Sequence, residues 1–243
     1  MNQKLDIQDF SIVLAIRNQN PTIVTPDFLK GSGVIPGDWE LARPPVLSAQ
    51  TTQIIFKNGI KIDAQLGSIS FSQGLDSPQS QELKDIEIPD MARRYTASLP
   101  NLEYRGVGIN PRRFVAFGDG ANQAHKYITE TILSRGSWQE FGTSPMQVGV
   151  NLVYTLEGCQ LRLGINEAQL QTPDREAIPA VVFTGNFHYD LTGESTGERL
   201  NHLREILNNW EKDFRTYREL IDSKFLTGTK DDYDAVLPIL AAQ

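Results

Sequence analysis

The side chains that most often perform acid–base and metal chemistry are sparse in this chain. It contains three histidines, His125, His188 and His202, and none lies at metal-ligand spacing from another. The sequence has no His-Glu-x-x-His pattern and no Cys/His cluster, so it predicts no metal site. His188 precedes Tyr189 and Asp190, which would supply a base, a hydroxyl and a carboxylate if the three side chains converged. A hydrolase or transferase using these residues is therefore one alternative hypothesis.

Nucleophilic catalysis has little support in the sequence. Cys159 is the only cysteine, so no internal disulfide can form, which favours a reducing compartment. A reactive cysteine needs a cation or a helix N-terminus to lower its pKa, and only Arg162 is close in sequence. We interpret Cys159 as a buried small residue. With 30 acidic residues present, choosing a catalytic carboxylate pair is arbitrary; the candidates are Asp119, Glu130, Asp190 and Glu194.

Two glycine-containing segments are candidate nucleotide or anion sites. Gly106-x-Gly108 is followed by Asn110-Pro111 rather than by a third glycine and a helix, so it does not match the dinucleotide-binding pattern. Gly118-Asp119-Gly120 precedes a predicted helix but lacks the Lys and Ser/Thr of a phosphate-binding loop. The sequence therefore predicts no cofactor and no catalytic signature, which favours a non-enzymatic protein.

Charge and composition exclude further classes of function. The formal net charge is −7, and the basic clusters are only the pairs Arg93-Arg94 and Arg112-Arg113. Binding to nucleic acid or to an anionic membrane depends on many Lys and Arg contacts, so we expect neither partner. The chain starts without an apolar signal core, and no apolar run approaches the ~20 residues of a membrane span. These features predict a soluble cytoplasmic protein.

The elements that would position any site alternate between strands and helices. Asn58-Gly59 predicts a two-residue hairpin turn with positive φ at both positions. Asn110-Pro111 is predicted to end a strand, because proline is disfavoured inside strands, and residues 112–117 either extend that strand or repeat it. Runs rich in apolar and β-branched residues, which alternate with polar residues in 60–65, predict strands at 10–17, 53–57, 60–65, 68–72, 102–109, 146–156, 159–165 and 180–189. The remaining pattern predicts helices at 25–31, with Thr25 as the cap, and at 90–98 and 122–134.

The C-terminal quarter carries the strongest helical signal. Ser195-x-x-Glu198 is a capping box, and it predicts a helix that begins there and runs to Phe225. About 28 helical residues would extend roughly 40 Å. The residues of its apolar face follow spacings of three and four; they are Leu200, Leu203, Leu207, Trp210, Phe214, Tyr217 and Ile221.

Two stretches near the C-terminus are candidate partner-binding sites. One is the aromatic part of the long helix, whose alternative role is packing in the core. The other is the tail, 226–243, in which an apolar run follows acidic residues and could dock as a strand on another sheet. The predicted partner-binding residues are Trp210, Phe214, Tyr217, Phe225, Leu237, Ile239 and Leu240.

Glycine and tryptophan residues recur at matching positions in the two halves of the chain. Gly37 and Trp39 precede Gly136 and Trp138 by 99 residues, and Gly59 precedes Gly158 by the same distance. We interpret this register as an internal duplication. The predicted fold is α+β, with two tandem subdomains, 1–100 and 101–225, that each place helix on an antiparallel sheet, in one sheet or in two.

A family resemblance covers most of the chain. The segment from Tyr104 to Arg113 resembles the central strand of a sporadically distributed bacterial family of unknown function, which has a Tyr, a Gly-containing strand and an Asn there. Phe187 to Leu191, followed by a long helix with a Trp and a Phe, is similar to the C-terminal part of that family. The opening strand departs from it, because Phe10 to Ala15 lacks the usual Pro-Pro-hydrophobic-Val-Glu entry. The resemblance implies a fold and no particular activity.

The leading hypothesis is a non-enzymatic protein-binding or scaffold protein. It would bind a protein partner, or a second copy of itself, through a sheet edge, the long helix or the C-terminal tail. The main alternative is a small-molecule binding module, because a helix over a curved antiparallel sheet can enclose an apolar cavity.

Overall fold

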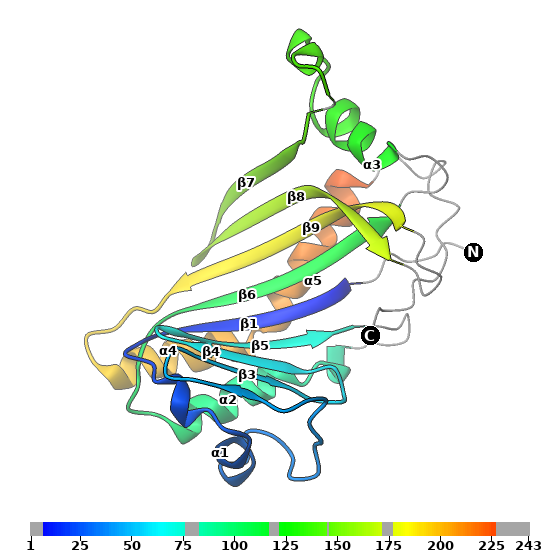
Figure 1. Ribbon diagram of the computed structural model, residues 1–243. Helices are drawn as coiled ribbons and strands as arrows, with labels where there is room; N and C mark the ends of the chain where they lie inside the picture. The colour runs from blue at the N-terminus through cyan, green and yellow to red at the C-terminus, as the bar shows by residue number, and fades with distance from the viewer. Residues whose placement is uncertain (1–6, 76–82, 117–121, 145, 172–176, 227–243) are drawn as a thin grey trace.

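A single antiparallel sheet of nine strands forms the centre of the protein. The computed structural model describes residues 7–75, 83–116, 122–144, 146–171 and 177–226. Across the sheet the strands follow the order β2 (Val46–Leu47), β3 (Thr51–Ile55), β4 (Lys61–Gln65), β5 (Ser68–Gly74), β1 (Ile7–Arg17), β6 (Glu103–Ala116), β9 (Ala177–Asp190), β8 (Cys159–Gln171) and β7 (Gly149–Leu156) (Figure 1). The predicted α+β class is confirmed, and the strands form one sheet rather than two.

Helices cover one face of this sheet and leave the other open. In Figure 1 the strands pass in front of α5. The helices are α1 (Pro26–Gly31), α2 (Ile88–Ser98), α3 (Gln123–Lys126), α4 (Thr196–Asn208) and α5 (Trp210–Leu220). Shorter helical turns are η1 (Pro21–Ile23), η2 (Leu83–Asp85), η3 (Tyr127–Ile132), η4 (Ser137–Glu140) and η5 (Ile221–Phe225).

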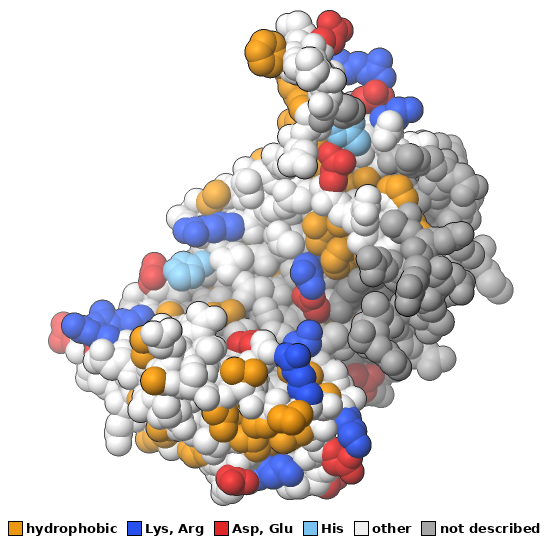
Figure 2. Space-filling view, in the orientation of Figure 1, with side chains coloured by type: hydrophobic (Ala, Val, Ile, Leu, Met, Phe, Trp, Pro, Cys, Tyr) orange, Lys and Arg blue, Asp and Glu red, His pale blue; other side chains and the backbone are white. Residues whose placement is uncertain are grey.

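The alternation of side chains along each strand explains why only one face is covered. In β1 the residues Phe10, Ile12 and Leu14 are fully buried, whereas Ser11 and Val13 between them remain partly exposed. Successive strand residues point to opposite faces, so the apolar set lies under the helices. Uncharged polar side chains and backbone make up most of the centre of the open face (Figure 2). That face therefore needs no apolar cover.

The two halves of the chain meet in the middle of the sheet. β1 pairs with β6 from Arg17 opposite Glu103 to Ile7 opposite Arg113. The first half contributes the order β3-β4-β5-β1, and the second half contributes β6-β9-β8-β7. The predicted division between residues 100 and 101 falls in the connection between α2 and β6.

The prediction that Asn110-Pro111 ends a strand is wrong, and the alternative, that the residues after it extend the strand, holds up to Ala116. β6 continues to Ala116, and Pro111 lies opposite Phe10 in β1. On the other side, β6 pairs with β9 up to Ile109 and again from Arg112, in the same register. The Asn186 Nδ2 group donates a hydrogen bond to Asn110 Oδ1 in this gap. Long pairings on both sides therefore hold a strand through a residue that lacks an N–H group.

The prediction of one continuous C-terminal helix is also wrong. The capping box is present, since Glu198 N donates to Ser195 Oγ at 3.1 Å. However, the chain changes direction at Asn209, whose φ and ψ are −103° and 10°, and α4 and α5 follow different lines (Figure 1). The bend lets α4 contact α2 and β6 while α5 packs against β1, β6 and β9. Packing on two surfaces outweighs the continuous helical pattern.

The first hairpin has a longer loop than the sequence predicts. Gly59 has a φ of 83°, and Asn58 is not among the residues with positive φ. Gly59 N donates to Phe56 O at 3.1 Å, and Phe56 N donates to Ile60 O at 2.9 Å. The turn is therefore a three-residue loop with a bulge at the glycine, and not a two-residue turn.

Candidate functional site

The aromatic residues of the C-terminal helix lie in the core of this chain. Trp210, Phe214 and Tyr217 are 6%, 3% and 0% exposed. The Phe10 ring of β1 lies 5.2 Å from the Trp210 ring and 5.5 Å from the Phe214 ring, centroid to centroid. The Tyr217 hydroxyl donates a 2.7 Å hydrogen bond to Phe183 O of β9. These side chains fill the space between α5 and the sheet, so we propose neither a partner surface nor a ligand cavity there.

The other predicted partner-binding residues divide into two groups. Phe225 is half-buried, and its ring lies 5.8 Å from the ring of Phe183. Leu237, Ile239 and Leu240 lie outside the residues that the structure describes. The apolar tail is therefore still a prediction.

His188, Tyr189 and Asp190 do not converge. They are consecutive residues of β9, so the side chain of Tyr189 points to the helix side and those of its neighbours point to the open face. On the open face His188 Nε2 lies 3.3 Å from Asp190 Oδ1, and the Asp190 side chain is 89% exposed. This arrangement is a solvent-exposed contact between two side chains and not a three-residue catalytic site.

Tyr189 instead contacts a carboxylate from α5. Its hydroxyl lies 2.8 Å from both carboxylate oxygens of Asp213, a residue that is only 6% exposed. Cys159, the first residue of β8, lies beside the Tyr189 hydroxyl. This cluster was not predicted from the sequence, although Asp213 follows Trp210 by three residues and precedes Tyr217 by four. An acidic residue inside an apolar helical face is a visible signal.

Burial sets the protonation of this cluster. It raises the pKa of Asp213 to about 6, while the hydroxyl of Tyr189 and the charge of Lys212 oppose the change. The pKa of Cys159 is raised by burial as well, so the thiol is kept in its neutral and unreactive form. Burial and the Asp213 charge raise the pKa of Tyr189. The cluster therefore has no activated nucleophile, and it acts as a polar contact between α5 and the sheet.

The remaining candidates from the sequence have structural roles. His125 Nδ1 contacts Glu167 Oε1 at 2.8 Å, and His202 Nδ1 accepts a hydrogen bond from Thr192 N at 3.1 Å. Gly106 and Gly108 lie within β6. In the described parts of the chain no cluster of three or more His, Cys, Asp or Glu side chains is arranged to hold a metal ion. Gly118-Asp119-Gly120 falls outside the described residues.

The outer edge of β7 is the feature that stands out as an interaction site. β7 is eight residues long, and among the described residues no strand pairs with the side that faces away from β8. It contains no charged residue and no proline. Natural proteins usually protect such an edge with charge, proline or a covering segment, because its free N–H and C=O groups can pair with another strand. Val153, in the middle of the strand, is 61% exposed.

The opposite edge of the sheet is closed. The segment 40–48 runs along the outer side of β3, where Val46 pairs with Gln53 and Leu47 pairs with Thr52. Further hydrogen bonds join Ala42 N to Ile55 O and Lys57 N to Glu40 O, both at 2.9 Å. Pro44-Pro45 and Arg43 lie in the same segment. Among the described residues, one edge of this sheet is therefore protected and the other is unpaired.

An arm of residues 136–144 adds apolar surface next to the free edge. It projects away from the sheet between α3 and β7 (Figure 1) and carries hydrophobic side chains (Figure 2). Phe141 is 89% exposed and Trp138 is 46% exposed, so Trp138 does not share the environment of Trp39, which packs 5.2 Å from Phe56. Exposed aromatic residues are common at protein interfaces.

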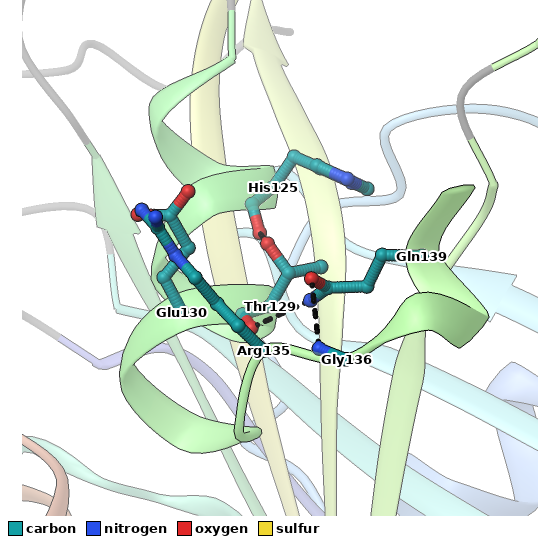
Figure 3. Close-up of polar contacts among 6 residues, drawn as sticks. All are labelled: His125, Thr129, Glu130, Arg135, Gly136 and Gln139. Carbon is teal, nitrogen blue, oxygen red and sulfur yellow. Dashed lines mark hydrogen bonds and ion pairs between the residues drawn. The ribbon is translucent and has the colours of Figure 1, made fainter.

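The base of the arm is fixed by polar contacts to η3. Gln139 Nε2 donates to Thr129 O at 2.9 Å, and Gly136 N donates to Gln139 Oε1 at 3.4 Å (Figure 3). At the end of the same turn, Arg135 pairs with Glu130. The base of the arm is therefore attached to η3, while Phe141 and Trp138 lie at the surface.

The function has to be inferred from these structural features, because no protein-family model matches the chain and no curated protein shows significant similarity to it. The resemblance to the bacterial family of unknown function stays a prediction. Within its described residues the chain has no helix that is both long enough and apolar enough to cross a membrane.

Proposed function

We propose that this protein is a non-enzymatic protein-binding protein that pairs an extended segment of another chain with the free edge of β7. The observation that carries the proposal is the contrast between the two edges. Segment 40–48 closes β3, whereas β7 is uncharged and has no partner among the described strands. Backbone groups of an added strand would supply affinity, and side-chain contacts with the arm would supply specificity.

Internal duplication is part of the proposal. We infer that 1–100 and 101–225 descend from one repeated unit. In support, each half has the order strand, helix, hairpin, strand and helix, and its strands occur in the same order outward from the centre of the sheet. Gly59 and Gly158, which are 99 residues apart, have φ angles of 83° and 82°. In this interpretation β7 corresponds to β3, and the added strand takes the place that β2 takes on β3.

The proposal extends to where the protein acts. The single cysteine fits a reducing compartment, so we place the function in the cytoplasm, with a protein partner and without nucleic acid or membrane. A small-molecule role has no comparable support, because aromatic rings occupy the space beneath α5.

Substitution of Val153 by Glu tests the proposal. A charge on an edge strand opposes addition of another strand, and Arg162 lies opposite to pair with the new carboxylate, so the fold should be retained. The matched control is Leu66→Glu, because Leu66 is 67% exposed and lies in the turn between β4 and β5. We expect affinity capture from the native cell, followed by cross-linking, to place partners on 136–156 in the wild type and the control but not in V153E. Partners that bind all three proteins equally would contradict the proposal.

A further inference from the structure

The sequence of β7 is nearly symmetric about Val153 over residues 150–156. Residues at equal distances on either side of it have the same chemical character. Leu152 corresponds to Tyr154, Asn151 to Thr155, and Val150 to Leu156. Reversed in direction, the strand therefore presents nearly the same row of side chains.

We propose that the segment pairing with β7 is β7 of a second copy of this chain, which joins the two sheets across a two-fold axis at Val153. The inference rests on the proposed function, and it names the partner at that edge. Two identical strands related by a two-fold axis perpendicular to the sheet pair in an antiparallel manner, as every neighbouring pair in this sheet does.

The register of the two β7 strands is the one that places similar side chains opposite each other. With Val153 of one copy opposite Val153 of the other, Leu152 faces Tyr154, Val150 faces Leu156, and Asn151 faces Thr155. Apolar residues then meet on the helix side, and small polar residues flank the two valines on the open side. A centre at Leu152 would instead place Asn151 opposite Val153 and leave a polar group against an apolar one.

Charge restricts where a second copy can bind. The chain has a net charge of −7, so two copies repel each other over most of their surfaces. β7 has no charge, and in this register the nearest acidic residue, Glu157, lies opposite Gly149 of the other copy. The edge of β7 is therefore a place where two copies can approach without bringing acidic groups together.

The assembly would have defined properties. A dyad perpendicular to the sheet places the helices of both copies on the same side of a continuous sheet of eighteen strands, twice the nine of one chain. The contact is closed, so association stops at two copies. An eight-residue edge is small for a stable interface, so we expect a reversible dimer with a dissociation constant on the order of micromolar.

The first experiment measures the mass of the full chain in solution. Sedimentation equilibrium between roughly 1 and 100 μM, a range that spans the expected dissociation constant, should show a monomer–dimer equilibrium for the wild type. The variant V153E should remain monomeric over that range, and L66E should dimerise as the wild type does. Circular dichroism of each variant confirms that the fold is retained.

The second experiment locates the dyad. In a Cys159→Ser background, Val153→Cys should form a disulfide between copies under mild oxidation, because residues directly opposite in an antiparallel pair have Cα atoms about 4.5–5.5 Å apart. Leu66→Cys in the same background should remain uncross-linked. A wild type that is monomeric throughout, or a dimer that V153E leaves intact, would overturn the self-pairing.

The two proposals fail in different ways. If the wild type is monomeric but V153E loses a partner captured from the cell, the self-pairing is overturned and edge binding stands. If V153E changes neither the mass nor the set of captured proteins, both proposals are overturned.

Discussion

Asp213 is a buried acidic residue among the apolar side chains of α5. It lies on the apolar face of α5, and its carboxylate accepts a hydrogen bond from the Tyr189 hydroxyl. Burying an ionised carboxylate costs free energy even when it is hydrogen-bonded, which is why its pKa is raised to about 6. The residue therefore links the docking of α5 to pH.

The sign of this link can be tested with Asp213→Asn. Since the pKa of Asp213 is about 6 in the folded state and 3.8 without burial, the folded state binds the proton more tightly. The contribution of Asp213 to the free energy of unfolding should therefore rise as pH falls from 8 to 5. We expect D213N to be more stable than the wild type by about 1–2 kcal/mol at pH 8, with the difference shrinking towards pH 5.

Urea unfolding at several pH values measures this difference. Asp38→Asn is the matched control, because Asp38 is exposed and lies outside the core, so the same change of side chain there should alter the free energy of unfolding by less than about 0.5 kcal/mol. A D213N difference that does not change with pH would show that Asp213 is not the group responsible.

At the scale of elements, the contact between α5 and β9 depends on a glycine. A Cβ atom on Gly185 would lie 2.8 Å from Tyr217 Cδ2 and 3.2 Å from Pro111 Cγ. Tyr217 is fully buried, and its hydroxyl is bonded to Phe183 O. The ring therefore lies directly on the backbone of β9, and the glycine makes room for it.

Gly185→Ala should consequently destabilise the protein. The tyrosine ring cannot move away without breaking its hydrogen bond, so we expect the free energy of unfolding to fall by about 2–3 kcal/mol. Gly37→Ala is the control, because a Cβ atom there would have no neighbour within 4 Å and the φ of Gly37 is not positive; it should change stability by less than about 0.5 kcal/mol. Equal midpoints of urea unfolding for the two variants would contradict this account of the contact.

At the scale of the whole molecule, the central β1–β6 pairing determines whether the two halves unfold together or separately. The halves share a sheet, and β6 runs for 14 residues, most of them paired with β1 on one side and β9 on the other. Separating them would expose a long strand edge in each and part of the apolar core. We therefore expect the two halves to unfold together.

Tryptophan fluorescence can follow each half separately. Trp39 lies in the first half, and Trp210 lies in the second, against Phe10 of the first. In one variant that keeps only Trp39 and another that keeps only Trp210, with phenylalanine at the other two positions, the fluorescence midpoint should coincide with the circular-dichroism midpoint of the same variant. A fluorescence transition that precedes the loss of secondary structure in either variant would show that the halves unfold independently.

Local patterns determined much of this protein in advance. The apolar strand at 10–17, the capped helix after Thr25 and the capping box at Ser195 all depend on neighbouring residues, and the structure confirms each of them. Hydrophobic periodicity and caps act over one or two turns, so the sequence alone indicates them. The apolar face around Trp210 was equally visible, but the sequence left open whether it binds a partner or packs in the core, and the structure places it in the core.

Only the tertiary structure decided which features are available to a partner. Asn110-Pro111 locally predicts the end of a strand, but pairing with β1 on one side and β9 on the other continues the strand through it. The helical pattern continues through Asn209, but the packing of α4 and α5 on different parts of the molecule bends the chain there. The free edge of β7 has the same origin. Its sequence predicts a strand, but whether a strand is central or at the edge depends on pairings between residues far apart in the chain, and no local pattern encodes them.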